Sequence, residues 1–178
     1  MKKCIFVVDV QKGFINDNTK FVINRIENLL RKDIFNLVIS TRFRNLKNSP
    51  YQKILHWDRL MSYEEQVLNN IVKLSADYII DKEIYTSVNK KTLGILKKNN
   101  IEKVFIAGID TDCCVLKTAA DLFENNIHPY VLSYYSASTG GEKSNNAGLT
   151  VLERLIGGDN IIREPINEKI LDDLVKDK

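Results

Sequence analysis

Short apolar runs alternate along the chain with segments of helical periodicity. The runs are continuous rather than alternating in polarity, which is typical of strands buried on both faces of a parallel sheet. They cover residues 5–8, 37–39, 78–80, 104–107, 130–132 and 160–162. Between them, apolar positions recur at a spacing near 3.6, which predicts helices over residues 22–30, 67–74, 93–96, 115–123, 149–156 and 168–175. Strand–helix alternation of this kind predicts a doubly wound α/β sheet with helices on both faces.

The composition narrows the class of protein further. The 178 residues are 44% hydrophobic and 28% charged, without a linker, a repeat or a low-complexity stretch. We therefore expect a single domain over residues 1–178, a three-layer α/β/α structure with a mostly parallel six-stranded sheet in Rossmann-like order. No apolar run approaches the ~18 residues of a membrane span, so we expect no membrane contact. The N-terminus enters a strand at once and the three cysteines are odd in number, which predicts a cytoplasmic protein with reduced thiols and no signal peptide.

The densest basic stretch runs from Arg42 to Arg59 and holds five Lys and Arg residues against Asp58 alone. It has two interpretations, a nucleic-acid surface or a solvated loop and helix face. The sequence pI is ≈ 8.6, whereas a pI above about 9 is the usual signature of nucleic-acid binding. We therefore expect no nucleic-acid partner. Whether this stretch or His56 contacts a substrate stays open.

Ligands of doubly wound sheets bind beyond the carboxyl ends of the strands. Asp9 follows the first predicted strand, Lys82 follows the third, and Cys113 and Cys114 follow the fourth. Each residue alone is more simply a surface charge, a cap or a packing residue. Together at one edge of the sheet, a thiol, an acid and an amine form a nucleophile with a base and an electrostatic partner.

The turn after the fourth strand has further features of a nucleophile site. Thr111 or Asp112 is a suitable N-cap for a helix that begins near Val115, so Cys114 is expected in the first helical turn. Free N–H groups and the helix dipole there would lower the pKa of the thiol and hold an oxyanion. The alternatives are a small apolar residue that packs helix on sheet, and a redox sensor that uses Cys113 and Cys114.

Three motifs in this order resemble those of the isochorismatase-like cysteine hydrolases, a superfamily that includes nicotinamidases and N-carbamoylsarcosine amidases. They lie at residues 6–11 with Phe14, at residues 82–87, and at residues 108–115 followed by 118–121. The resemblance implies a catalytic triad of Asp9, Lys82 and Cys114, with Cys114 chosen because it directly precedes a valine. It also implies a cis peptide bond between Ile109 and Asp110, and an oxyanion hole made by the backbone N–H groups of Asp110 and Cys114.

The function implied is hydrolysis of a C–N bond in a small molecule, an amide, ureido or carbamoyl compound, through a thioester. Asp9 would take the thiol proton and Lys82 would stabilise the charge. The alternatives are an isochorismatase-type vinyl-ether hydrolase, which can work with the acid alone, and a non-catalytic small-molecule-binding domain of the same fold. Relatives are commonly oligomers, so we expect a homodimer or a homotetramer.

Nicotinamidases of the superfamily bind a divalent metal after strand two through an Asp-x-His pattern and further histidines. Here residues 41–47 are basic and the chain has only His56 and His128, so we expect neither a metal nor another cofactor. Arg42 and Arg44 could attract a carboxylate-bearing substrate, although solvated arginines are the simpler interpretation. The candidate pocket walls, each equally plausible as a surface or core residue, are Phe14, Asn45, Tyr51, Trp57 and Tyr85.

Overall fold

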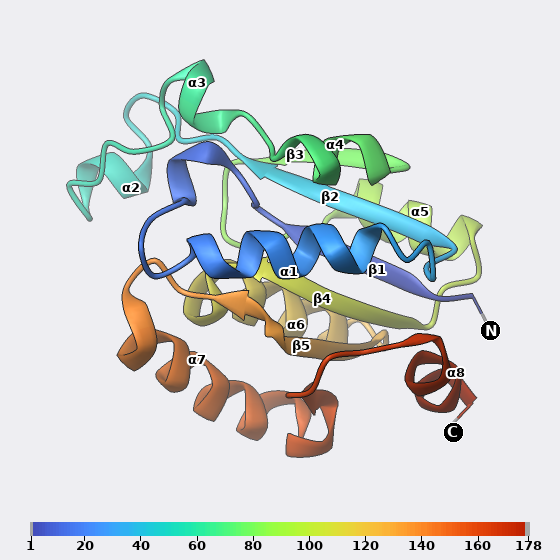
Figure 1. The fold of residues 1–178 in the computed structure, drawn as a ribbon. Helices are drawn as coiled ribbons and strands as arrows, with labels where there is room; N and C mark the ends of the chain where they lie inside the picture. The colour runs from blue at the N-terminus through green and yellow to red at the C-terminus, as the bar shows by residue number, and fades with distance from the viewer. Residues whose placement is uncertain (1, 177–178) are drawn as a thin grey trace.

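The computed structural model describes residues 2–176, and its centre is one parallel sheet of six strands in the order β3-β2-β1-β4-β5-β6 (Figure 1). The strands are β1 (Cys4–Val8), β2 (Leu37–Phe43), β3 (Tyr78–Lys82), β4 (Lys103–Ile109), β5 (His128–Ala137) and β6 (Ile161–Ile162). This confirms the predicted fold class. The strand order reverses between β1 and β4, so their carboxyl ends flank the crevice in which such folds bind ligands.

Helices cover both faces of the sheet (Figure 1). One face packs against α1 (Lys20–Leu30), α4 (Asn70–Ser75) and α8 (Glu168–Lys176), and the other packs against α5 (Lys90–Lys98), α6 (Leu116–Glu124) and α7 (Gly141–Ile156). The two cores divide β1 between them: Ile5 and Val7 lie in the first and Phe6 and Val8 in the second. Successive side chains of a strand point to opposite faces, which explains why the buried strands are apolar throughout.

The remaining elements are short and lie in the connections. They are α2 (Pro50–Lys53), α3 (Tyr63–Gln66), the 3₁₀ turns η1 (Lys12–Phe14) and η3 (Gly158–Asn160), and the π-helical turn η2 (Thr111–Val115). The helix predicted over residues 67–74 is shorter than expected, because the chain is still extended at Val67 and Leu68. Asn69 starts α4 by accepting the N–H groups of Ile71 and Val72 at its side-chain oxygen.

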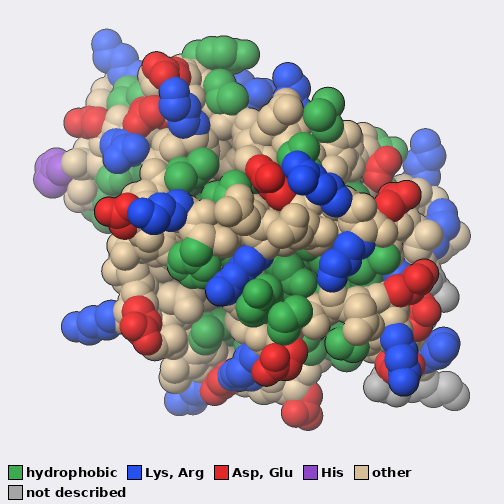
Figure 2. Space-filling view, viewed as in Figure 1, with side chains coloured by type: hydrophobic (Ala, Val, Ile, Leu, Met, Phe, Trp, Pro, Cys, Tyr) green, Lys and Arg blue, Asp and Glu red, His purple; other side chains and the backbone are tan. Residues whose placement is uncertain are grey.

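Charges of both signs are interspersed over the face seen in Figure 2. Within the basic stretch, Arg42 pairs with Asp81 and Arg59 pairs with Glu65. These ion pairs divide the stretch into smaller groups of mixed charge. Within residues 2–176, no helix has both the length and the apolar character needed to cross a membrane.

Candidate active site

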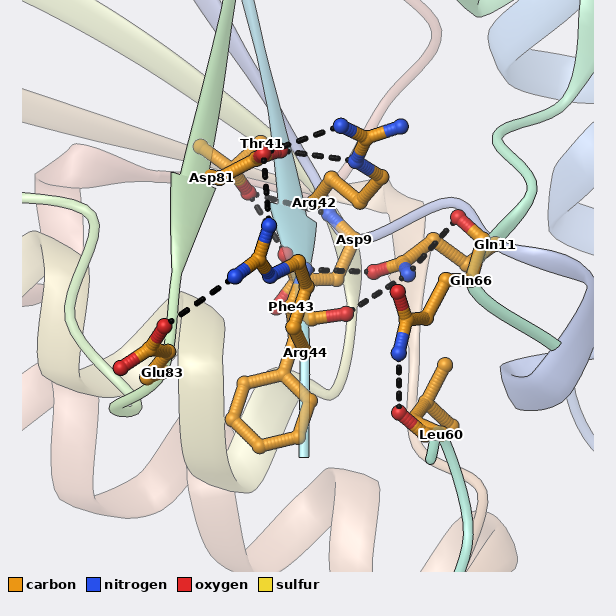
Figure 3. Close-up of polar contacts among 10 residues, drawn as sticks. All are labelled: Asp9, Gln11, Thr41, Arg42, Phe43, Arg44, Leu60, Gln66, Asp81 and Glu83. Atoms are coloured by element: carbon orange, nitrogen blue, oxygen red, sulfur yellow. Dashed lines mark hydrogen bonds and ion pairs between the residues drawn. The ribbon is translucent and has the colours of Figure 1, made fainter. Parts of the chain in front are cut away.

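Asp9 directly follows β1 and has a φ of 51°, in the left-handed region that few non-glycine residues adopt. Thr41 of β2 fixes its side chain, because the threonine hydroxyl donates to Asp9 Oδ1 at 2.7 Å (Figure 3). The same hydroxyl oxygen accepts the backbone N–H of Asp9 at 3.2 Å. The carboxylate is therefore held at the carboxyl edge of the sheet in one orientation, with Oδ2 directed to another partner.

That partner is Lys82, the last residue of β3. Its ammonium nitrogen lies 2.6 Å from Asp9 Oδ2 and 3.3 Å from Cys114 Sγ. It also donates to the carbonyl oxygens of Ile84 at 3.1 Å and Tyr85 at 3.0 Å. The side chains of Lys82 and Asp9 are 1% and 0% exposed, so these contacts replace the water that both charges have lost. We call Asp9, Lys82 and Cys114 the triad cluster.

Cys114 lies in η2, after β4, and the local geometry differs from the prediction of an ordinary capped helix. Asp110 occupies the N-cap position without a capping side-chain bond, and the peptide bond between Ile109 and Asp110 is cis. The carboxylate of Asp112 accepts the Ser138 hydroxyl at 2.6 Å. The prediction of Thr111 or Asp112 as the cap was therefore wrong, since the acids of this turn bind residues that follow β5.

The predicted low pKa of the Cys114 thiol was also wrong. Burial raises the pKa of Cys114 well above its ordinary value, and the negative charge of Asp9 raises it further, while Lys82 opposes both effects. Burial would lower the pKa of Lys82, but the charges of Asp9 and Cys114 outweigh it and the pKa is raised. Cys114 is thus a protonated thiol at neutral pH, between a lysine that favours the thiolate and a carboxylate able to accept its proton.

Cys114 is one of the residues that line a cavity of ≈ 240 Å³. Four of the five candidate wall residues line it: Phe14, Tyr51, Trp57 and Tyr85. Asn45 is not among the lining residues, because its amide donates to the carbonyl oxygens of Trp57 at 2.9 Å and Arg59 at 3.0 Å. The complete lining is Phe14, Phe43, Tyr51, Leu55, Trp57, Tyr85, Asp110, Cys113, Cys114 and Thr139.

Gln11 positions this wall, a role that the sequence analysis missed. Its side-chain oxygen accepts the backbone N–H of Phe43 at 2.7 Å, and its amide nitrogen donates to the Phe43 carbonyl at 2.9 Å (Figure 3). The amide also donates to the carbonyl of Gln66 at 3.1 Å. A glutamine two residues after Asp9 in a segment that leaves a buried strand was the available signal, since a buried amide needs such partners.

Arg42 of β2 and Arg44, just after that strand, bind a different set of partners. Arg42 makes two hydrogen bonds to the Asp81 carboxylate, at 2.7 and 2.9 Å, and Arg44 reaches Glu83 at 3.4 Å (Figure 3). Neither arginine is among the cavity-lining residues. Within residues 2–176, no group of three or more His, Cys, Asp and Glu side chains is arranged to hold a metal ion. The residues present after β2 therefore do not fit a metal site of the nicotinamidase kind.

Comparison with known proteins assigns the chain to a family. The model of the isochorismatase domain matches residues 3–157. The chain belongs to the isochorismatase family. Among the curated relatives of this chain, isochorismatase family protein 1B of Dictyostelium discoideum is 28% identical to it over 155 residues. These residues are 85% of this chain and 68% of the relative.

Solved structures show the same fold at lower identity. Nicotinamidase from Bacillus subtilis is 17% identical to this chain, with a TM-score of 0.79. The match covers 92% of this chain and 100% of the nicotinamidase. N-carbamoylsarcosine amidase from Thermoplasma acidophilum is 21% identical with a TM-score of 0.78, over 94% and 99% of the two chains. The chain thus has the isochorismatase-like hydrolase fold, and its family supports a hydrolase.

Proposed function

We propose that this isochorismatase-family protein is a cysteine-dependent hydrolase of a C–N bond in a small amide, ureido or carbamoyl compound. One observation carries the proposal. The Lys82 ammonium lies 2.6 Å from the Asp9 carboxylate and 3.3 Å from the Cys114 sulfur, and Cys114 is one of the residues that line a cavity. A nucleophile, a proton acceptor and a fixed positive charge thus meet beside a space of small-molecule size.

The first half-reaction follows from the raised pKa of the thiol. Because Cys114 is protonated at neutral pH, its proton passes to Asp9 as the sulfur attacks the substrate carbonyl carbon. Lys82 stabilises the negative charge on the sulfur during this transfer. The carbonyl oxygen becomes an oxyanion, which the N–H groups of Asp110 and Cys114 are proposed to bind. Collapse of this intermediate breaks the C–N bond, and Asp9 returns the proton to the leaving nitrogen.

The second half-reaction regenerates the thiol. A water molecule gives a proton to Asp9 as its oxygen attacks the thioester carbonyl. The C–S bond then breaks, and the proton on Asp9 returns to the sulfur of Cys114. Lys82 keeps its proton throughout, because Asp9 and Cys114 raise its pKa. The substrate therefore gains one water molecule in total and the protein is unchanged.

The test is turnover of a panel of small primary amides, ureas and N-carbamoyl compounds, measured as ammonia or amine release. Cys114→Ala should lower turnover by at least about 10³-fold, because it removes the nucleophile. Cys113→Ala is the matched control and should stay within about tenfold of the parent, since the neighbouring thiol forms no bond in the mechanism. Mass spectrometry of the quenched reaction should find the acyl group on Cys114.

Three outcomes would contradict the proposal. Turnover that survives in Cys114→Ala but not in Asp9→Asn would instead favour an acid-catalysed reaction such as vinyl-ether hydrolysis. Binding of panel compounds without any turnover by the parent protein would favour a non-catalytic binding domain. Reversible oxidation of Cys113 and Cys114 by peroxide, with no hydrolysis of the panel, would favour a redox sensor.

A further inference from the structure

Outside the triad cluster, the cavity is lined mainly by apolar side chains and by one acidic residue. Five of its described residues present aromatic rings, and Leu55 adds an aliphatic surface. Asp110 is the lining residue that carries a charge in its ordinary ionised form, and its charge acts on the neighbouring wall residues Tyr85 and Cys113. The wall thus combines aromatic faces with one carboxylate.

The Asp110 carboxylate is fixed in place but its charge is not neutralised by these contacts. The backbone N–H of Thr139 donates to Asp110 Oδ1 at 2.6 Å, and the Thr139 hydroxyl donates to Oδ2 at 3.0 Å. Both donors are neutral groups. The negative charges of Asp112 and Asp9 also act on Asp110, and they have the same sign as its own. Each carboxylate oxygen has a second lone pair for a further donor.

The basic side chains near the site already have partners of their own. Lys82 is paired with Asp9 at 2.6 Å, so the two charges cancel. Arg42 is paired with Asp81 at 2.7 Å, in the group of β2 and β3 side chains seen in Figure 3. A ligand in the cavity therefore meets a surplus of negative charge from Asp110. Aromatic faces add to this effect because their quadrupoles attract cations. Phe43 illustrates the attraction, with the Lys82 nitrogen 5.2 Å from its ring centroid.

We propose that the cavity selects substrates that carry a positive charge away from the scissile bond, such as amides with an ammonium or guanidinium group, and that Asp110 is the specificity-determining residue. The choice of amides as substrates rests on the proposed hydrolase function, whereas the preference for a cation can be measured by binding alone. This preference is opposite to the one expected had Arg42 and Arg44 faced the ligand.

The titration of Asp110 gives the proposal a pH dependence. Burial raises the pKa of Asp110 to about 6, against the Thr139 hydrogen bonds that lower it, and the charges of Asp112 and Asp9 raise it further. Tyr85 and Cys113, which also face Asp110, have raised pKa values and are neutral in this range. A bound cation favours the carboxylate form. Affinity for a cation should therefore be full above this pKa and should weaken as the pH falls through about 6.

The test compares three amides of similar length: γ-aminobutyramide, which is a cation, valeramide, which is neutral, and glutaramate, which is an anion. Their affinities for Cys114→Ala protein are measured by calorimetry, so that no turnover is needed. γ-Aminobutyramide should bind at least about tenfold tighter than valeramide, as a charge-assisted hydrogen bond in a buried site provides, and glutaramate should bind most weakly. The preference for γ-aminobutyramide over valeramide should shrink when the pH is lowered from about 8 to about 5.

A second pair of variants locates the effect. Asp110→Asn, added to Cys114→Ala, should reduce the ratio of the two affinities to near one. Asp112→Asn is the matched control. It removes the same charge two residues further along the chain, and Asp112 is not among the residues that line the cavity. It should keep the preference. The pH comparison needs no change at Asp110, so it remains decisive if Asp110→Asn fails to fold.

Equal affinity for γ-aminobutyramide and valeramide, or tighter binding of glutaramate, would overturn the proposal. A cation preference that persists in Asp110→Asn would overturn the role of this residue. Absence of binding by all three compounds would also count against the cavity as the recognition site. If γ-aminobutyramide is preferred yet the parent protein hydrolyses no amide, the hydrolase proposal fails and the cation selectivity stands.

Discussion

The two oxygens of Asp9 have different partners, and this division is the most consequential detail at the scale of single residues. Thr41 donates to Oδ1 at 2.7 Å and fixes the orientation of the carboxylate, while Lys82 lies 2.6 Å from Oδ2 and balances its charge. The position of the carboxylate therefore does not depend on the ion pair alone. Asp9 can accept a proton on one oxygen without losing the hydrogen bond that holds the other.

Asp9→Asn should change the thiol pKa and the turnover independently. The negative charge of Asp9 raises the pKa of Cys114, so its removal leaves Lys82 as the nearest charge and should lower that pKa. Alkylation of Cys114 by iodoacetamide, followed by mass spectrometry against pH, should titrate at lower pH than in the parent. Amide turnover should nevertheless fall by about 10²–10⁴-fold, since the proton acceptor is lost.

Asp81→Asn is a suitable control for this experiment. It removes a negative charge one residue from Lys82, but that carboxylate is partly exposed and pairs with Arg42 outside the cluster. The titration of Cys114 should change little. A thiol whose alkylation profile is the same in Asp9→Asn and in the parent would show that Asp9 does not set the protonation of the sulfur.

At the scale of elements, β4 approaches β1 very closely at Gly108. Gly108 of β4 has a φ of 132°, and a Cβ atom built on it would lie 2.1 Å from the carbonyl oxygen of Val8 in β1. The pairing of β4 with β5 is also irregular between Ile106 and Gly108. Glycine is needed here because both the backbone conformation and the close approach exclude a side chain. The close approach lies directly before the turn that carries Cys114.

Gly108→Ala should therefore destabilise the protein by more than about 3 kcal/mol or prevent folding, as measured by urea unfolding. Gly94→Ala is the matched control in the middle of α5. A Cβ atom at Gly94 meets nothing within 4 Å, so this change should stabilise the protein by about 0.5–1 kcal/mol through the better helix propensity of alanine. Equal effects of the two substitutions would contradict the close approach of β4 to β1.

The sequence predicted the elements whose burial makes their residues apolar. It missed the parts of elements that are polar or exposed. Each of the six strands contains a short apolar run and was identified from it, but β5 was expected to end at residue 132 and continues to Ala137. Ser138, which binds Asp112 of η2, and Thr139, which binds Asp110 just before η2, were missed for this reason. The first two turns of α7 were missed because they are mostly polar and exposed.

The same contrast holds for the candidate site. Asp9, Lys82 and Cys114 follow apolar strands and could be placed at one sheet edge from sequence, and the structure brings their side chains together. The pKa of Cys114 could not be predicted, because it depends on how completely the thiol is buried and on its distance from Asp9. Asn45 was expected at the pocket, but the direction of its amide depends on how the following loop folds back.

At the scale of the whole molecule, the assembly stays a prediction from the family resemblance. One chain has a mass of 20.4 kDa. Sedimentation equilibrium should give twice or four times that mass, for a homodimer or a homotetramer, and the value should hold on dilution through the micromolar range. A species of 20.4 kDa at all concentrations would contradict it. The measurement also bears on the cavity, because Leu55 on its wall is 56% exposed and is open to contact from outside the chain.

The connection from β2 to α3 has a closed base and a projecting tip. At its base, the backbone N–H of Asn45 donates to the carbonyl of Leu60 at 3.0 Å, and the Gln66 side chain donates to the same carbonyl at 2.9 Å. The tip between them supplies Tyr51, Leu55 and Trp57 to the cavity. Because the base is held by hydrogen bonds that do not involve the tip side chains, an exchange of residues 46–56 could recast the choice of substrate and leave the reacting groups where they are. Descendants of this chain could thus acquire new substrates by changes in a single surface segment, without changes in the sheet.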